Sequence, residues 1–382
     1  MVNPNIRLIR AVGMAIGAVV GAGVFGLPYA FVQSGFAIGL LVLLTMAGFL
    51  TLLQLMFAEV ASQTNGKDRF VGYVRRYLGD RWARLTLVAF LGSFWGAMVA
   101  YMIVGGSFWH QLFLPIFQGP EPLYALLIAV VASAFIYRGL RFASRLEVVV
   151  VGVLLFLFAF IMLAALPHIH LPNLNHMDWT QVLTPYGVVL FALSGLGIIP
   201  EIKDVLGSRM RHRLPQVVVT AMVVITLLYA LFTFVVVGVN GPSTTEVSFE
   251  GLVPVLGGGF GFIGALLGSV TILSIYLMVG VELLKTLEVD FRLSRPVAWA
   301  MTCGVPIILY AAGLREFVGV IGFVGAVFSG FLGIVVVRMY ESFKESPLCR
   351  APTCLRLPRV VSWVLVLLFA SGILLEIGTL LR

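Results

Sequence analysis

Charged side chains are scarce in this sequence of 382 residues. Asp, Glu, Lys and Arg make up 11% of it, whereas an average soluble domain carries roughly 25%. This shortage excludes a soluble enzyme, a disordered protein and a nucleic-acid-binding domain. Hydrophobic residues account for 60% of the chain and the mean hydropathy is +1.06. The composition therefore predicts an all-α integral membrane protein that lies in the lipid bilayer.

Apolar stretches of about 20 residues, the length that crosses a bilayer, recur along the whole sequence. We expect eleven transmembrane helices, at residues 8–32, 36–62, 85–112, 122–137, 147–166, 183–206, 215–238, 260–284, 296–312, 317–337 and 360–380. Of the 25 Lys and Arg residues, only Arg315 and Arg382 then fall on the side opposite the N-terminus. Because short cytoplasmic loops carry the excess of Lys and Arg, we predict a multi-pass protein of the cell membrane with its N-terminus in the cytoplasm and its C-terminus outside. The net charge of +8 thus needs no nucleic-acid partner.

Cysteine is also rare, with three residues at positions 303, 349 and 354. The last two lie in a loop predicted to face the cytoplasm, where thiols stay reduced, so we expect them to remain unpaired. The loops contain no Ser-His-Asp order, no phosphate-binding motif and no paired catalytic carboxylates. The sequence therefore predicts a protein that is not an enzyme, that needs no organic cofactor, and that shows no sign of an obligate protein partner.

Glycine and proline interrupt the first and the sixth expected spans. Residues 21–28 read Gly-Ala-Gly-Val-Phe-Gly-Leu-Pro, and residues 194–200 read Ser-Gly-Leu-Gly-Ile-Ile-Pro. The first string matches a dinucleotide-binding fingerprint, but it lacks the preceding strand and the later acidic residue that this fingerprint requires. Both residue types weaken a helix, and bare backbone inside a membrane is tolerated only where it lines a cavity or is buried in protein. A simple kink would explain the first string alone, but two interrupted spans in corresponding positions indicate a transporter site.

The two interruptions are five spans apart, an odd number, so the second half of the chain would cross the membrane in the opposite sense. We therefore expect an inverted repeat, with residues 1–166 holding the first five spans and residues 167–340 the next five. Residues 341–382 would add a cytoplasmic loop and an extra C-terminal helix. The amphipathic stretch 68–78 is predicted to form a surface helix, and the Ser- and Thr-rich stretch 243–254 occupies the corresponding position in the second repeat.

On these motifs, the sequence resembles the amino acid/auxin permeases and the aromatic amino acid permeases of the amino acid–polyamine–organocation superfamily. Residues 10–31 resemble the first helix of that group, and residues 191–201 resemble its sixth. The resemblance implies the LeuT-type fold of five plus five helices, with helices 1 and 6 interrupted. It also implies alternating access and symport of an amino acid with H⁺ or Na⁺.

An amino acid at mid-membrane needs donors for its carboxylate and acceptors for its ammonium group. The free ends of broken helices supply both without charged side chains. We therefore expect substrate contacts from Ala22, Gly23 and Val24 for the carboxylate, and from Phe191, Ser194 and Gly195 for the ammonium and the side chain. The resemblance adds Tyr101, for which an ordinary packed tyrosine is the alternative. The near absence of mid-membrane charge favours a neutral amino acid, aromatic and hydrophobic ones among them.

The coupling ion remains open between Na⁺ and H⁺. The resemblance implies a Na⁺ site formed by Gly17 and Val20 with Thr271 and Ser274, although the adjacent hydroxyl pair typical of such sites is missing. The lysine that some proton-coupled relatives carry on the fifth span is also absent. Glu201 is the deepest acidic residue, and its alternatives are a proton carrier, a gate paired with a base such as Lys203, or a structural cap. An amino acid sensor that binds without transport is the alternative function.

Overall fold

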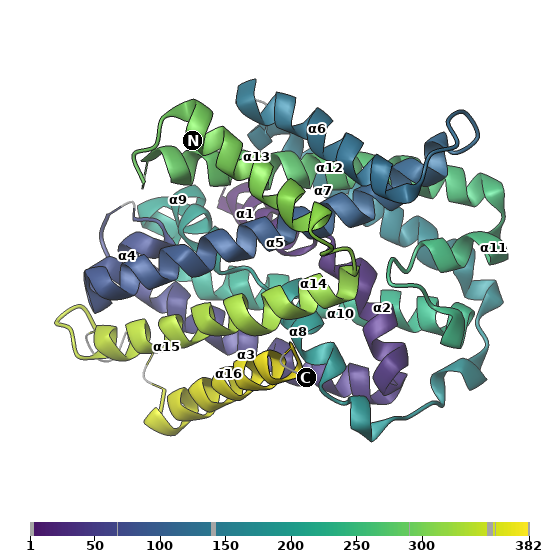
Figure 1. Ribbon diagram of the computed structural model, residues 1–382. Helices are drawn as coiled ribbons and strands as arrows, with labels where there is room; N and C mark the ends of the chain where they lie inside the picture. Colours follow the sequence, from purple (N-terminus) through teal and green to yellow (C-terminus); the bar gives the residue numbers. More distant parts are fainter. Residues whose placement is uncertain are drawn as a thin grey trace.

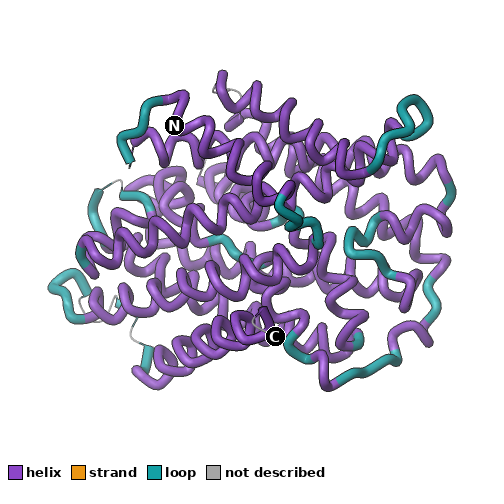
Figure 2. The backbone as a smooth tube through the Cα atoms, in the orientation of Figure 1, coloured by secondary structure: helices purple, strands orange, loops and turns teal. Residues whose placement is uncertain are grey.

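The computed structural model describes residues 4–66, 68–138, 143–289, 291–349, 354–355 and 357–380, and these residues form helices joined by loops, with no strand among them (Figures 1 and 2). Backbone amides in a bilayer must bond within the protein, and an apolar helix meets this requirement by itself. The long helices are α3 (Phe36–Gln63), α5 (Asp80–Phe113), α6 (Glu121–Arg138), α7 (Ala143–Ala165), α10 (Leu214–Asn240), α12 (Gly258–Val289), α13 (Arg295–Ala311) and α16 (Arg359–Leu380).

Three other stretches are divided into shorter helices. They are α1 (Pro4–Val19) with α2 (Gly23–Ser34), α8 (Thr184–Ala192) with α9 (Ile199–Met210), and α14 (Phe317–Phe323) with α15 (Gly330–Lys344). In the described part of the chain, seven helical stretches are long and apolar enough to cross a membrane, and the pair α1–α2, bent by 56°, would make an eighth. The count of eleven spans stays a prediction.

The bundle has two ends, each with a short helix beside it. Helix α4 (Phe70–Leu78) lies at one end and α11 (Val253–Leu256) at the other, on the left and right of Figure 1. We call these the α4 end and the α11 end. The stretch that was expected to mirror the α4 segment consists of separate short turns rather than one helix: Gly241–Ser243, Glu250–Leu252 and α11.

The middle of the bundle is formed by unusually close backbone contacts. Helix α8 packs between α2 and a π-helical turn, Val324–Ser329, that joins α14 to α15. A Cβ atom added to Gly187 would meet the backbone of Gly322, and one added to Gly325 would meet the backbone of Gly187. Small residues allow helices in membranes to approach in this way. Helix α8 is thereby held against α2 on one side and against the α14–α15 stretch on the other. Of the three divided stretches, α1–α2 and α8–α9 are the two in which the sequence predicts a break, and we call them the two broken stretches.

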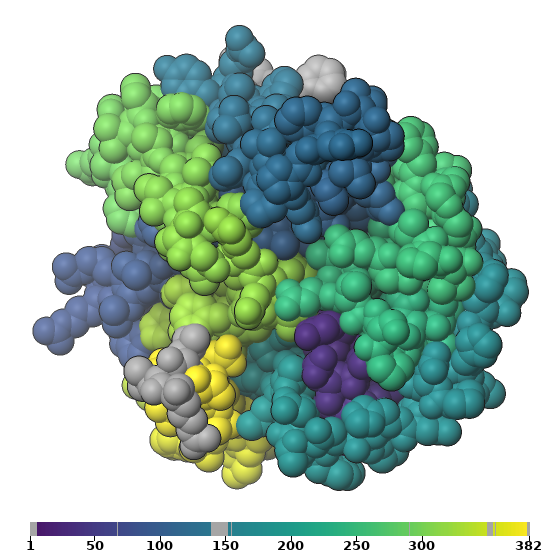
Figure 3. Space-filling view, turned by 45° about the vertical axis from the view of Figure 1, so that its right-hand side comes forward, coloured from purple at the N-terminus to yellow at the C-terminus, as the bar shows by residue number. Residues whose placement is uncertain are grey.

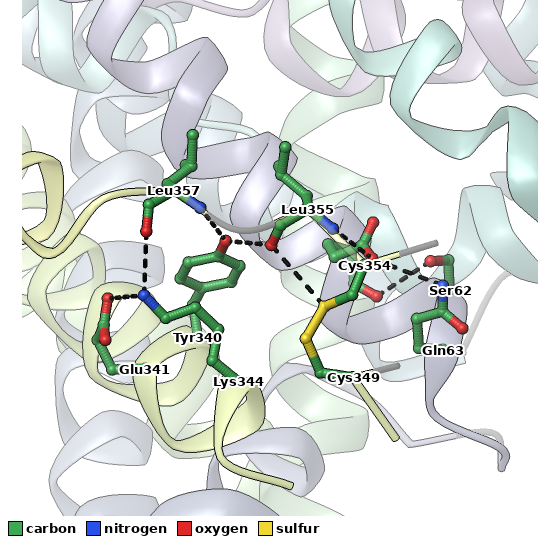
Figure 4. Close-up of a disulfide and its surroundings, with 10 residues drawn as sticks. Ser62, Gln63, Tyr340, Glu341, Lys344, Cys349, Cys354, Leu355 and Leu357 are labelled. Atoms are coloured by element: carbon green, nitrogen blue, oxygen red, sulfur yellow. Dashed lines mark hydrogen bonds and ion pairs between the residues drawn. A yellow bond between two sulfur atoms is a disulfide. The ribbon is translucent and has the colours of Figure 1, made fainter. Parts of the chain in front are cut away.

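The loop after α15 differs from the expectation, because Cys349 and Cys354 form a disulfide (Figure 4). The Tyr340 hydroxyl on α15 donates to the Leu355 carbonyl at 2.5 Å, and the Leu355 amide donates to Glu59 Oε1 on α3 at 3.2 Å. These bonds fix the residue after Cys354 against α15 and α3, next to the disulfide. A sequence separation of five residues does not by itself reveal such anchoring.

Candidate functional site

A cavity of about 290 Å³ lies where the two broken stretches face each other. Its walls come from α1 and α2, α5, α8 and α9, α12, and the π-helical turn with α15. Most of the expected site residues line it: Gly17, Val20, Ala22, Gly23, Tyr101, Phe191, Ser194, Gly195 and Glu201. The fold therefore brings together residues that are far apart in the sequence.

Three of the expected residues do not line this cavity. Val24 is fully buried one position further along α2. On α12, the Thr271 hydroxyl donates to the Leu267 carbonyl at 2.9 Å and the Ser274 hydroxyl donates to the Val270 carbonyl at 2.7 Å. The two hydroxyls thus bond to their own helix, whereas Gly17 and Val20 face the cavity.

The first break occupies only three residues. Helix α1 ends at Val19 and α2 begins at Gly23. The first N–H groups of a helix have no partner within it, and they lie at the positive end of the helix dipole. A Cβ atom added to Gly21 would lie 3.4 Å from the Tyr101 hydroxyl, so this hydroxyl sits beside the break. A Cβ atom added to Gly23 would lie 2.8 Å from the Ala192 Cα, so only glycine fits there.

The second break is longer and presents side chains to the cavity. After α8 ends at Ala192, a 3₁₀ turn at Leu196–Ile198 precedes α9. The Ser194 hydroxyl donates to the Leu190 carbonyl at 2.7 Å and lies 3.0 Å from the Ser329 hydroxyl, to which it can also donate. Ser329 was missed by the sequence analysis. The sequence does contain a signal for this region. Glycines recur at positions 322, 325, 330 and 333, and repeated small residues mark close contacts between helices.

The charged residues that line the cavity, Glu201 and Glu282, lie toward the α4 end. Glu201 Oε1 accepts a hydrogen bond from Arg69 Nη1 at 2.5 Å, and the two side chains are 37% and 65% exposed. The anticipated partner Lys203 instead donates to the Thr64 carbonyl at 2.8 Å and to the Tyr73 hydroxyl at 2.9 Å. Among the described residues, no group of three or more His, Cys, Asp or Glu could hold a metal ion.

A family model described as transmembrane amino acid transporter protein matches residues 4–337. The chain belongs to this transporter family. Its relatives include the tyrosine-specific transport system 1 of Haemophilus influenzae, 27% identical over 200 residues that make up 52% of this chain and 50% of that protein. The putative sodium-coupled neutral amino acid transporter 11 of Bos taurus is 31% identical over 117 residues, which are 30% of this chain and 25% of the cattle protein. The matched residues thus cover half or less of the length of these curated relatives.

A solved structure shows the same fold. The crystal structure of MhsT in complex with L-phenylalanine superposes with a TM-score of 0.65 at 14% sequence identity, over 96% of this chain and 97% of MhsT. The family inferred from residues 10–31 and 191–201 and its LeuT-type fold are thereby confirmed. The eleven spans and the inverted repeat remain predictions.

Toward the α11 end, aromatic side chains close the bundle on that side of the first break. The Phe25 ring lies 5.6 Å from that of Phe108 and 5.9 Å from that of Phe158. The Ser248 amide donates to the Phe25 carbonyl at 3.1 Å, so the segment before α11 is bonded directly to α2. In the space-filling view, the N-terminal segment is visible as a small purple patch among green and teal residues (Figure 3). The residues that line the cavity come from the breaks and from the α4 side of them, and none comes from α2 beyond Gly23.

Proposed function

We propose that this transporter carries a neutral amino acid, with aromatic and hydrophobic side chains preferred, by symport with H⁺ or Na⁺ and alternating access. The observation that carries the proposal is the cavity between the two breaks, where helix ends and hydroxyls lie beside the breaks, while the charged Glu201 and Glu282 lie further toward the α4 end. The N–H groups that begin α2 would receive the carboxylate, since anions bind at helix N-termini. The hydroxyls of Ser194 and Ser329 would accept from the ammonium group, with backbone carbonyls of the cavity-lining residues Phe191, Ser194 and Gly195.

The preference for aromatic and hydrophobic side chains is supported by the cavity walls. Rings from Phe90, Phe94 and Phe191 line them together with Ile275 and Met278. Small-molecule sites are generally apolar with a few fixed polar groups, which matches this composition. The relatives point the same way, because one is named for tyrosine transport and MhsT holds L-phenylalanine.

We propose further that the α4 end faces the cytoplasm, following the distribution of Lys and Arg. In the reducing cytoplasm the Cys349–Cys354 disulfide at this end would open to two thiols. The chain would then cross the cell membrane eleven times, with inverted repeats at residues 1–166 and 167–340 and an additional helix in residues 341–382. On this orientation the cavity is open toward the cytoplasm. Glu201 would serve as part of a cytoplasmic gate, which its bond to Arg69 supports.

The proposed coupling sites make different demands on the structure. A Na⁺ site at Gly17, Val20, Thr271 and Ser274 would require both α12 hydroxyl oxygens to come closer to α1, because neither residue lines the cavity that Gly17 and Val20 face. Their hydrogen bonds within α12 leave oxygen lone pairs available for the ion. A proton carried by Glu201 would require this carboxylate to leave Arg69 during the transport cycle.

The test is uptake of a labelled mixture of neutral amino acids into proteoliposomes, driven by a pH gradient or by a Na⁺ gradient. Accumulation driven by pH alone would support Glu201 as the proton carrier, and accumulation driven by Na⁺ alone would support the α1–α12 site. Binding without accumulation under either gradient would instead indicate a sensor. No binding of any neutral amino acid would contradict the proposal.

The site assignment has its own test in two glycine variants. Gly23→Ala should abolish uptake, because its Cβ would overlap the Ala192 backbone. Gly13→Ala on α1 is the matched control, since a Cβ atom there would have no neighbour within 4 Å. Normal uptake by the Gly23 variant would remove this break from the binding site.

A further inference from the structure

One buried hydroxyl joins the two breaks. The Tyr229 hydroxyl on α10 lies 3.2 Å from the Val19 carbonyl and 3.0 Å from the Ala192 carbonyl, with donor geometry toward both. Val19 is the last residue of α1, and Ala192 is the last residue of α8. The Tyr229 side chain is fully buried and is not among the residues that line the cavity.

These two carbonyls need a donor because the helices that would have supplied it end there. An unpaired backbone group is costly inside a membrane, where water cannot replace the missing partner. A tyrosine hydroxyl has a single proton to donate, so the two carbonyls share it. Movement of either helix end would therefore change how the proton is shared.

The breaks are thus held together on two sides. Packing of Gly23 against Ala192 fixes how close α2 comes to α8, and the Tyr229 hydroxyl connects the end of α1 to the end of α8. A second polar side chain from a neighbouring helix supports the longer break, because Gln54 Nε2 on α3 donates to the Leu193 carbonyl at 3.4 Å. All of these groups lie beside the backbone that the proposed substrate would contact.

We propose that Tyr229 is a positioning residue that holds the two breaks at the separation that amino acid binding requires. This inference rests on the proposed function, because it assigns Tyr229 to the same site without giving it a contact to the substrate. The hydroxyl acts through the carbonyls of Val19 and Ala192. Its removal leaves the cavity walls in place but frees the breaks to move apart.

The test compares Tyr229→Phe, which keeps the ring and removes the hydroxyl, with Tyr186→Phe. Tyr186 is the matched control because its hydroxyl donates to the Leu368 carbonyl at 3.3 Å, away from the cavity. With labelled L-tyrosine as the probe, Tyr229→Phe should raise the KM of uptake about tenfold or more, as expected when buried carbonyls lose their donor. The maximal rate should change much less, and Tyr186→Phe should leave both parameters near those of the unmodified protein.

A second measurement needs no substrate. Amide hydrogen exchange in residues 19–25 and 190–198 should become faster in both segments of Tyr229→Phe and in neither segment of Tyr186→Phe. Unchanged KM and exchange in Tyr229→Phe, or equal changes in the two variants, would overturn the inference. If the unmodified protein takes up no amino acid, the proposed function fails, and the exchange result alone then decides whether Tyr229 joins the breaks.

Discussion

At the α11 end, Ser248 and Phe249 are both fully buried, whereas at the α4 end the Arg69–Glu201 ion pair is 65% and 37% exposed. Removing a buried phenylalanine typically costs about 3–5 kcal/mol of stability. An exposed ion pair is typically worth about 0–1 kcal/mol. The α11 end is therefore closed by packing, whereas the α4 end has only a side-chain contact that breaks at little cost. This difference in packing explains why the cavity extends toward the α4 end in this structure.

The largest effect is expected for Phe249→Ala. Its ring lies 5.5 Å from that of Phe108 and 5.6 Å from that of Phe260. Truncation should lower the free energy of unfolding by about 3–5 kcal/mol and lower the Tm of the purified protein. Phe262→Ala is the control, because this ring is 56% exposed, and it should lower the Tm much less. Equal shifts would mean that packing does not close the α11 end.

The sequence predicted the helical membrane fold and the positions of both breaks, because composition and glycine–proline placement are local signals. The bond from Tyr229 to the breaks could not be predicted, since its acceptors lie 210 and 37 residues away. From the sequence alone, a tyrosine in an apolar span that bonds to distant carbonyls cannot be distinguished from one that only packs against its neighbours. Thr271 and Ser274 stay a prediction that rests on the family resemblance. In this structure their hydroxyls bond to the preceding turn of α12, as hydroxyls on a helix often do.

Glu250 gives the packed α11 end a dependence on pH. Its carboxylate accepts from the Ser107 hydroxyl on α5, and burial raises its pKa above the usual value, with Glu121 and Glu246 adding to the rise. Because the folded state holds the proton more tightly than the unfolded state, stability should increase as pH falls through the folded pKa and level off below the unfolded pKa. The Tm should therefore increase as the pH is lowered from neutral to about pH 5, a range that lies above the ordinary pKa of glutamate.

Glu250→Gln tests this assignment, since an amide cannot titrate. Its Tm should vary less with pH than that of the unmodified protein. Glu345→Gln is the control, because Glu345 is 76% exposed, and its pH profile should follow that of the unmodified protein. If the Tm of Glu250→Gln varies with pH as much as that of the unmodified protein, other titratable groups cause the pH dependence.

The smallest effect on stability is expected for Arg69→Ala, at most about 1 kcal/mol because the pair with Glu201 is exposed. Raising the salt concentration to about 1 M should reduce even this effect, since the Debye length is then near 3 Å. Arg75→Ala is a control with similar exposure, because Arg75 pairs with Asp80 and neither residue lines the cavity. Uptake measurements test whether the Arg69–Glu201 pair is a gate. If it is, Arg69→Ala and Glu201→Gln should change the uptake rate by similar amounts. The double variant should change it no further, because the effects of residues that act through one contact are not additive. If Arg69→Ala lowers the Tm as much as Phe249→Ala does, the contacts at the α4 end are not weaker than the packing at the α11 end. That result would contradict our explanation for why the cavity extends toward the α4 end.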